Sequence, residues 1–122
     1  MSHSIDYAEL HSQDPRRARS FYAELFGWKT DDKETPMGVY TEIDTGGGIG
    51  AGLMKAPFAG GASYWTPYVT VPGLDAAVER AQKLGARVEA PRATIPDVGH
   101  FAVLRDPAGA VFGLFEKLGT AK

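Results

Sequence analysis

Cysteine is absent from all 122 residues of the chain. Its absence excludes disulfides, thiolate catalysis, zinc–thiolate sites and iron–sulfur clusters. Long apolar runs are missing too, because no segment approaches the roughly 20 apolar residues that span a bilayer. The N-terminal segment is polar and lacks the apolar centre of a signal peptide. We therefore expect a soluble, cytoplasmic protein.

An excess of positive charge is missing as well. The chain has 13 Lys and Arg residues against 15 Asp and Glu residues, which gives a formal net charge of −2. Neither a basic cluster for phosphate groups nor a basic stretch for an anionic membrane is present. We therefore expect no nucleic-acid partner and no membrane partner.

One helix has both its start and its end marked in the sequence, between Asp14 and Trp28. Asp14 is suited to cap the first free amides, and Pro15 suits the first helical position, where no amide donor is needed. Gly27 then ends the helix. An apolar stripe recurs at helical spacing and comprises Ala18, Phe21, Tyr22, Leu25 and Phe26.

A second helix, from Leu74 to Gly85, repeats this pattern about half a chain length later. Its apolar stripe comprises Leu74, Ala77, Val78, Ala81 and Leu84. Each helix follows a strand-like segment and precedes several more, which indicates a duplicated unit. With 43% hydrophobic residues, the chain is long enough for one core and too short for two independent domains. We expect one α+β domain of two similar modules, at residues 1–56 and 64–117, with a linker at 57–63 and a tail at 118–122.

The strand-like segments either alternate apolar and polar residues or are rich in β-branched and aromatic residues. They are Ile5–His11, Trp28–Asp32, Gly38–Asp44, Ile49–Lys55, Tyr64–Val71, Ala86–Ala90, His100–Arg105 and Ala110–Glu116. Turns or loops are predicted at Lys33–Met37, at the glycines of residues 46–50, at Pro91–Gly99 and at Asp106–Gly109. The glycines are not followed by Lys-Ser/Thr or by a helix, so a hairpin is favoured over a phosphate loop. Pro67 indicates an edge position or a bulge for its strand.

Three stretches together resemble the vicinal oxygen chelate superfamily, which includes glyoxalase I, bleomycin-resistance proteins and extradiol dioxygenases. They are FYAELFGW at the end of the first helix, DAAVERAQKLGA in the second helix, and IPDVGHFAVLRDPAGAVFGLFE near the end. The resemblance covers almost the whole chain and is strongest to glyoxalase-related proteins of unassigned activity. It implies two βαβββ modules, a curved, mostly antiparallel eight-stranded sheet around a cup, and a homodimer.

The resemblance also implies which positions of the sequence would bind a metal. Metal enzymes of the superfamily hold a divalent ion at four positions, on the first and last strands of each module. Here these positions carry Tyr7, a residue within Ile49–Met54, Thr66 and Gly113, none of which is a good ligand for a divalent ion. We therefore predict no cofactor, with a divalent metal as the alternative.

Glu9 and His11 are the candidate catalytic residues. Strand alternation places both on the same face as Tyr7, while Leu10 faces the other way, under a helix. The two side chains would serve as a base and its orienting partner, or as two ligands of a displaced metal. The competing interpretation is an ordinary hydrogen-bonded pair at a strand end.

A ligand-binding cup needs mainly apolar and aromatic walls with few polar groups. Besides Glu9 and His11, the candidate wall residues are Tyr7, Tyr40, Thr66, Tyr68, Phe115 and, near the mouth of the cup, His100. Ordinary core packing explains any one of the aromatic residues equally well, and a solvated position at a loop end explains His100.

The resemblance implies a small-molecule-binding protein or an enzyme of unassigned activity, of the glyoxalase and bleomycin-resistance type, and we expect it to act without the standard metal centre. Its partner is a small organic ligand that the sequence does not identify. The alternative is a divalent-metal-dependent lyase or isomerase resembling glyoxalase I, with ligands such as Glu9 and His11. A third class, a module that serves as a subunit of a larger assembly, suits the size of the chain.

Overall fold

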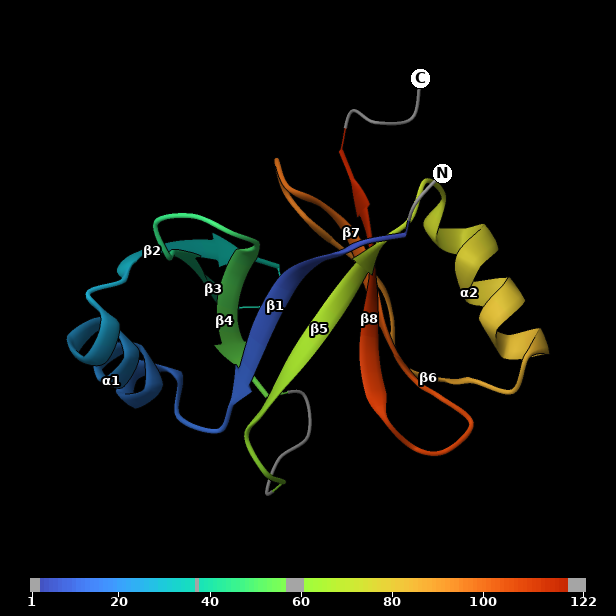
Figure 1. The fold of residues 1–122 in the computed structure, drawn as a ribbon, viewed down its shortest axis with the longest axis horizontal. Helices are drawn as coiled ribbons and strands as arrows, with labels where there is room; N and C mark the ends of the chain where they lie inside the picture. The colour runs from blue at the N-terminus through green and yellow to red at the C-terminus, as the bar shows by residue number, and fades with distance from the viewer. Residues whose placement is uncertain (1–2, 37, 57–60, 119–122) are drawn as a thin grey trace. The chain divides into compact units, whose positions relative to one another are not determined.

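The structure is a computed structural model that describes residues 3–36, 38–56 and 61–118 (Figure 1). Its elements follow the order β1 (Ile5–Ser12), α1 (Pro15–Phe26), β2 (Lys29–Thr35), β3 (Gly38–Asp44), β4 (Gly50–Lys55), β5 (Tyr64–Thr70), α2 (Leu74–Lys83), β6 (Arg87–Ile95), β7 (Gly99–Arg105) and β8 (Val111–Lys117). A strand, a helix and three strands thus occur twice. The predicted α+β fold of two βαβββ modules is confirmed. No helix in the described ranges is long and apolar enough to cross a membrane.

The chain forms two compact units, one of Tyr7–Thr66 and one of Met1–Asp6 with Pro67–Lys122. In the Tyr7–Thr66 unit the strand order is β2-β3-β4-β1, with parallel pairing only between β1 and β4. In the other unit the order is β5-β8-β7-β6, with parallel pairing only between β5 and β8. Of the predicted linker and tail, residues 57–60 and 119–122 lie outside the described part of the chain.

The first helix begins and ends where the sequence predicts. The Asp14 carboxylate accepts a hydrogen bond from the backbone amide of Arg17 at 3.2 Å, and Pro15 occupies the first turn. Gly27 ends the helix with a φ of +73°, a left-handed conformation that favours glycine. Local capping chemistry therefore determines both ends of α1.

Helix α1 packs on the predicted apolar face of β1. The buried residues of this cluster are Leu10, Ile43, Ala51 and Leu53, and Ala18, Tyr22 and Trp28 pack against them. Leu10 thus lies under the helix, as strand alternation predicts. The opposite face of β1 carries Tyr7, Glu9 and His11.

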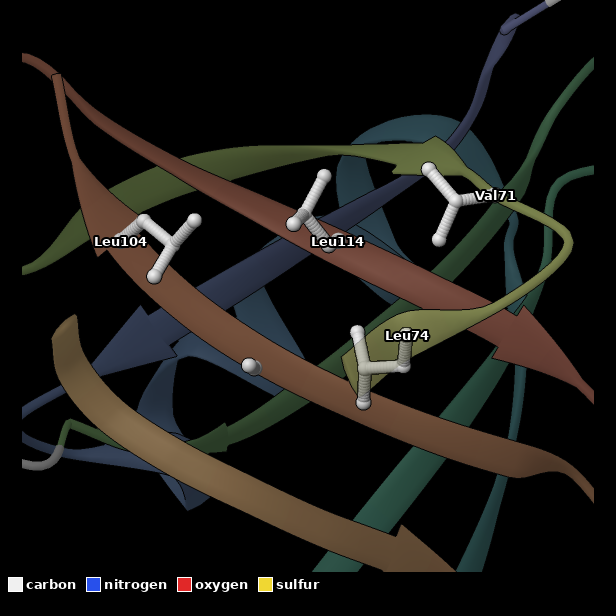
Figure 2. Close-up of a cluster of buried hydrophobic side chains, with 5 residues drawn as sticks. Val71, Leu74, Leu104 and Leu114 are labelled. Atoms are coloured by element: carbon white, nitrogen blue, oxygen red, sulfur yellow. The ribbon is translucent and has the colours of Figure 1, made fainter. Parts of the chain in front are cut away.

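The core of the other unit lies between α2, β7 and β8. Figure 2 shows Val71, Leu74, Leu104 and Leu114 gathered into this cluster, which also contains Ala102. Partly buried residues pack around it, namely Val69, Ala77, Val78, Ala81, Val88 and Phe112. The predicted stripe of α2 is confirmed except at Leu84, which lies beyond the helix end and is 63% exposed.

The predicted turn at Lys33–Met37 is wrong over its first three residues. Strand β2 continues to Thr35, because its backbone pairs with β3 up to the partners Thr35 and Gly38. The Thr35 hydroxyl also donates a hydrogen bond to the Gly38 carbonyl at 2.7 Å. The sequence of β2 is mostly charged and has no apolar alternation, so no local pattern predicts a strand here. Backbone pairing with β3 stabilises the strand instead. Met37 lies outside the described residues.

The predictions for two prolines also need correction. The expected loop Pro91–Gly99 is strand as far as Ile95, and the pairing of β6 with β7 shifts register on both sides of Ala90. A register shift accommodates Pro91, because a bulged residue needs no ladder amide. The strand that contains Pro67 is hydrogen-bonded on both sides near its end, because the amide of Thr70 donates to the Ser4 carbonyl and that of Val71 to the Phe115 carbonyl on β8. Of the two alternatives predicted for Pro67, the edge position is therefore wrong, and the bulge stays a prediction.

We expect Leu104→Ala to lower the free energy of unfolding by about 2–5 kcal/mol, because it leaves a cavity in a well-packed cluster. Leu104 has no exposed surface. Leu84→Ala is the control with the same change of side chain at an exposed site, and its expected cost is within about 0.5 kcal/mol. Urea denaturation of both variants measures the difference. Equal losses would contradict the assignment of this core.

Candidate functional site

A buried acid–imidazole pair lies on the face of β1 that points away from α1. Glu9 and His11 are each only 2% exposed, and the Glu9 Oε1 atom lies 2.7 Å from His11 Nε2. A hydrogen bond of this kind is required here, because a buried carboxylate that has lost its water must be compensated by donors. Glu9 and His11 are two residues apart on β1, so their side chains lie on the same face and form this hydrogen bond directly.

Thr66 on β5 completes the hydrogen bonds of the imidazole. Its hydroxyl oxygen lies 3.0 Å from His11 Nδ1, and Thr66 has no exposed surface. A neutral His11 donates from Nε2 to Glu9 and accepts from the Thr66 hydroxyl at Nδ1, whereas an imidazolium donates on both sides. The Tyr64 ring packs edge-on against His11, with 5.1 Å between ring centroids.

Two tyrosines extend this group on the carboxylate side. Tyr40 on β3 is 2% exposed, and its hydroxyl is hydrogen-bonded to that of Tyr7. Burial is the main reason that the pKa of each phenol is raised well above its usual value, and the negative charge of Glu9 raises both pKa values further. Both phenols therefore keep their protons at neutral pH.

Gly52 on β4 makes room for the two phenols. It is the register partner of Glu9. A Cβ atom at this position would lie 1.9 Å from the Tyr40 hydroxyl oxygen and 2.5 Å from that of Tyr7. Such distances are far below van der Waals contact, so the phenol pair depends on glycine at this position. We call Tyr7, Glu9, His11, Tyr40 and Thr66 the polar network.

The remaining predicted site residues lie in the other unit. Tyr68 is buried, and its ring packs edge-on against Phe101 at 6.0 Å. Gly113 is the register partner of Tyr68, and a Cβ atom there would lie 2.3 Å from the Tyr68 ring. Phe115 lies opposite Phe101 in the β7–β8 ladder. His100 Nδ1 lies 2.8 Å from the Thr94 hydroxyl oxygen on β6.

The four positions of the family metal do not fit a divalent ion in this chain. The Tyr7 phenol stays protonated, the Thr66 hydroxyl is hydrogen-bonded to His11, and Gly113 has no side chain. The segment Ile49–Met54 contains only glycine and apolar side chains. Within the described ranges, no three His, Asp or Glu side chains form a group that could hold a metal ion.

The lowered pKa values of two other acidic residues, Asp32 and Asp106, have a structural explanation. The pKa of Asp32 is lowered, first by a hydrogen bond from the Thr41 hydroxyl and also by Arg19, whose guanidinium lies 2.6 Å away. The pKa of Asp106 is lowered by backbone amides, that of Ala110 first. Asp106 accepts hydrogen bonds from the amides of Ala108 and Ala110 at 2.9 Å each, and these bonds hold the turn predicted at Asp106–Gly109.

Sequence reasoning did not single out Tyr64 or Gly52. Tyr64 has the same strand parity as Thr66, and this was the signal that would have placed its ring near His11. Gly52 carries no such signal, because its role depends on the register between β1 and β4 and on side chains from two other strands.

A family model described as a glyoxalase-like domain matches residues 7–115. The chain belongs to this glyoxalase-like domain family. The resemblance to the vicinal oxygen chelate superfamily is thereby confirmed. The match includes the whole polar network and most of the second module.

Curated relatives of this glyoxalase-like domain are longer proteins. "Putative glyoxylase CFP32" from Mycobacterium bovis is 33% identical over 118 residues, covering 91% of this chain and 44% of its own length. Anthracycline biosynthesis protein DnrV from Streptomyces peucetius is 28% identical over 124 residues, covering 89% of this chain and 45% of its own length. The chain spans less than half the length of these relatives.

Solved structures share the fold at low identity. Hypothetical protein BH1468 from Bacillus halodurans aligns with a TM-score of 0.73 at 13% identity, over 100% of this chain and 99% of its own. A variant of Streptomyces coelicolor methylmalonyl-CoA epimerase, in complex with 2-nitronate-propionyl-CoA, aligns with a TM-score of 0.70 at 15% identity, over 97% of this chain and 100% of its own. At such identities the likeness shows the fold alone.

We expect the stability of the domain to fall with rising pH once the pH passes about 10, the ordinary pKa of tyrosine. The pKa values of Tyr7 and Tyr40 are raised in the folded state, so above pH ~10 the unfolded chain releases phenol protons that the folded chain retains. The stabilising contribution is thus complete below pH ~10 and is lost as the pH rises toward the folded pKa values. Denaturant titrations from about pH 9 to about pH 11 should show a smaller decrease for a Y7F/Y40F double variant. Parallel curves would contradict the raised pKa values.

We expect Gly52→Ala to lower the free energy of unfolding by about 1–3 kcal/mol, the usual cost of overpacking. The added methyl group would collide with the phenols of Tyr40 and Tyr7. Gly47→Ala is the matched control, because a Cβ atom at Gly47 would meet nothing within 4 Å. If thermal and urea denaturation show the same change for both variants, the phenol pair does not fill the space at Gly52.

Proposed function

We propose that this glyoxalase-like domain binds a small organic molecule and works without a divalent metal at the four family positions. The observation that supports this most directly is the phenol pair of Tyr7 and Tyr40 packed against Gly52. Protonated phenols fill the space that a longer side chain on β4 would need. Instead of metal ligands, this face of the domain carries the hydrogen-bonded side chains of the polar network.

The burial of ionisable groups supports a functional role for this face of the sheet. An apolar core of the same shape would avoid the cost of removing Glu9 and His11 from water. Buried, interacting ionisable groups are typical of functional sites. Relatives with the same fold include an epimerase crystallised with a coenzyme A derivative and a protein of anthracycline biosynthesis. Small organic ligands are therefore the class that we propose for this chain.

The second candidate is a divalent-metal-dependent lyase or isomerase of the glyoxalase I type. Glu9 and His11 favour it, because a carboxylate and an imidazole are suitable metal ligands and their bonding atoms lie 2.7 Å apart. For a metal to bind there, the Glu9–His11 hydrogen bond would have to open and further ligands would have to come from elsewhere. This requirement makes the metal-dependent reading the weaker one.

Assembly is a separate part of the proposal. Membership of the superfamily supports the homodimer predicted from the sequence. A purely structural module would gain no stability from a small organic ligand, whereas a binding domain is stabilised by mass action.

Thermal melting of metal-stripped protein, with and without Ni²⁺, Zn²⁺, Mn²⁺ or Fe²⁺, tests the metal-free reading. We expect no stoichiometric metal by elemental analysis of untreated protein and no shift of the melting midpoint, because a metal that binds the native state raises it. His11→Gln is the informative variant if a shift occurs. A stoichiometric metal whose return restores stability, and whose effect is lost in H11Q, would overturn the proposal in favour of the lyase or isomerase.

A further inference from the structure

Helix α1 leaves much of its apolar stripe accessible to solvent. None of its residues is buried, and only Ala18 and Tyr22 of the stripe pack on the core cluster beneath the helix. The large side chains of the stripe that are more than half exposed are Phe21, Leu25 and Phe26. Packing within the Tyr7–Thr66 unit therefore does not account for this side of α1.

Trp65 extends the exposed apolar surface beyond the helix. It is itself exposed, and its ring lies edge-on against that of Tyr22, with 5.5 Å between centroids. The Tyr22 ring also contacts the rings of Phe21 and Phe26, at 5.0 and 6.3 Å between centroids. The exposed side chains thus surround one ring and form a single surface. We call Phe21, Leu25, Phe26 and Trp65 the α1 patch.

The area of the α1 patch suits the centre of a protein interface. A large aromatic side chain buries roughly 150–250 Å² when it is fully covered, so four side chains at about half exposure offer roughly 400 Å². Apolar patches of several hundred Å² on a soluble protein often mark an interaction site. An interface of standard size covers about 800 Å² on each partner, so the patch would supply about half of it and polar groups the remainder.

The charges of α1 run against the dipole of the helix. Arg16 and Arg17 lie in the first turn, near the positive end of the dipole, and Glu24 lies in the last turn, near the negative end. Helix α2 has the favourable order, with Asp75 in its first turn and basic residues in its last turn. An inverted neighbouring helix of the same sequence would bring acid to the arginine end of α1 and arginine to its acidic end.

One exposed face of α1 combines these charges with the apolar patch. Arg17, Phe21, Glu24 and Leu25 share this face, because spacings of four, seven and eight residues return to the same side of a helix. Arg17 and Glu24 are about 10 Å apart along the helix axis, too far for them to pair with each other. In the described part of the chain, neither side chain forms an ion pair.

We propose that the α1 patch forms the interface of a homodimer, in which two copies of α1 lie antiparallel about a two-fold axis near Phe21. A two-fold axis places residue i against residue j and j against i, so the interface must be self-complementary. With the axis near Phe21, Arg17 of each copy lies beside Glu24 of the other, and this pair occurs twice. This inference rests on the homodimer of the proposed function and states which surface forms it.

The same charges decide the direction of the helices and the kind of partner. A parallel pair would place Arg17 against Arg17 and Glu24 against Glu24, and like charges at such contacts are unfavourable. A different protein would have to present the opposite order of charges at the same spacing on either side of an apolar centre. A second, inverted copy of this chain supplies that order without any further requirement.

A hollow beside the N-terminal half of α1 has room for a side chain of the second copy. Its volume is about 360 Å³, and its lining includes Leu10, Arg17 and Phe21. Leu25 and Arg17 are each four residues from Phe21, so in the antiparallel arrangement the partner's Leu25 lies at the level of Arg17. This position is next to the hollow, where an apolar side chain would be covered.

Sedimentation equilibrium of the full chain tests this interface. We expect a monomer–dimer equilibrium in which Leu25→Asp raises the dissociation constant at least about tenfold, because it brings a charge into an apolar contact. Leu84→Asp is the matched control, since Leu84 is 63% exposed, Leu25 is 57% exposed, and Leu84 follows α2 in the other unit. L84D should leave the dissociation constant unchanged. Circular dichroism verifies that both variants are folded.

An exchange of charges tests the antiparallel arrangement. Arg17→Glu and Glu24→Arg should each raise the dissociation constant about tenfold, because each brings like charges together at two symmetric places. The double variant R17E/E24R should restore the wild-type value. R16E/E24R is the control with the same change of charge, because Arg16 lies about 100° around the helix from Arg17. This control should not restore the dimer.

The outcomes separate this inference from the proposed function. A wild-type chain that stays monomeric would leave the patch to a different protein and would overturn the inference together with the proposed homodimer. A dimer that L25D leaves intact would overturn the inference alone, because the homodimer would then use another surface. Failure of R17E/E24R to restore the dimer, or its restoration by R16E/E24R, would overturn the antiparallel arrangement. The metal-free reading is tested independently, by melting and elemental analysis.

Discussion

A carboxylate that has lost its water must be given hydrogen-bond donors, and the burial of Glu9 is the constraint on which the Tyr7–Thr66 unit depends. One donor comes from His11 on the same strand. The other ring nitrogen of His11 needs a partner too, and the Thr66 hydroxyl provides it. The network closes only because β1 presents Leu10 to the helix and its polar side chains to the opposite face.

The two modules are alike at the third residue of their last strand. In β4 the position opposite Glu9 is Gly52, and in β8 the position opposite Tyr68 is Gly113. At each glycine an aromatic side chain from another strand occupies the space that a Cβ atom would take. Of the four positions at which the resemblance implies metal ligands, one carries the phenol of Tyr7 and another, Gly113, has no side chain.

Much of the fold was predictable, because its signals act over a few residues. The cap of α1 by Asp14, its end at Gly27 and the turn around Asp106 each depend on neighbours along the chain. The strands β2 and β6 were less predictable. Charged residues extend β2 to Thr35, and β6 passes through Pro91, because pairing with β3 and β7 outweighs local preference. For the candidate site, alternation along β1 predicted that Glu9 and His11 share one face, but the extent of their burial depends on the strands around them.

The sequence by itself determined the duplicated βαβββ order, the helix ends and the face of β1 that carries Tyr7, Glu9 and His11, since helix capping and strand alternation are short-range effects. Only the tertiary structure decided the partners of those side chains. His11 and Thr66 are 55 residues apart in the chain, and Tyr7 and Tyr40 are 33 apart. Contacts over such separations depend on strand register, and the space at Gly52 exists only once β4 lies beside β1. Register is set by the summed pairing and packing of whole strands, and no local stretch of sequence contains it.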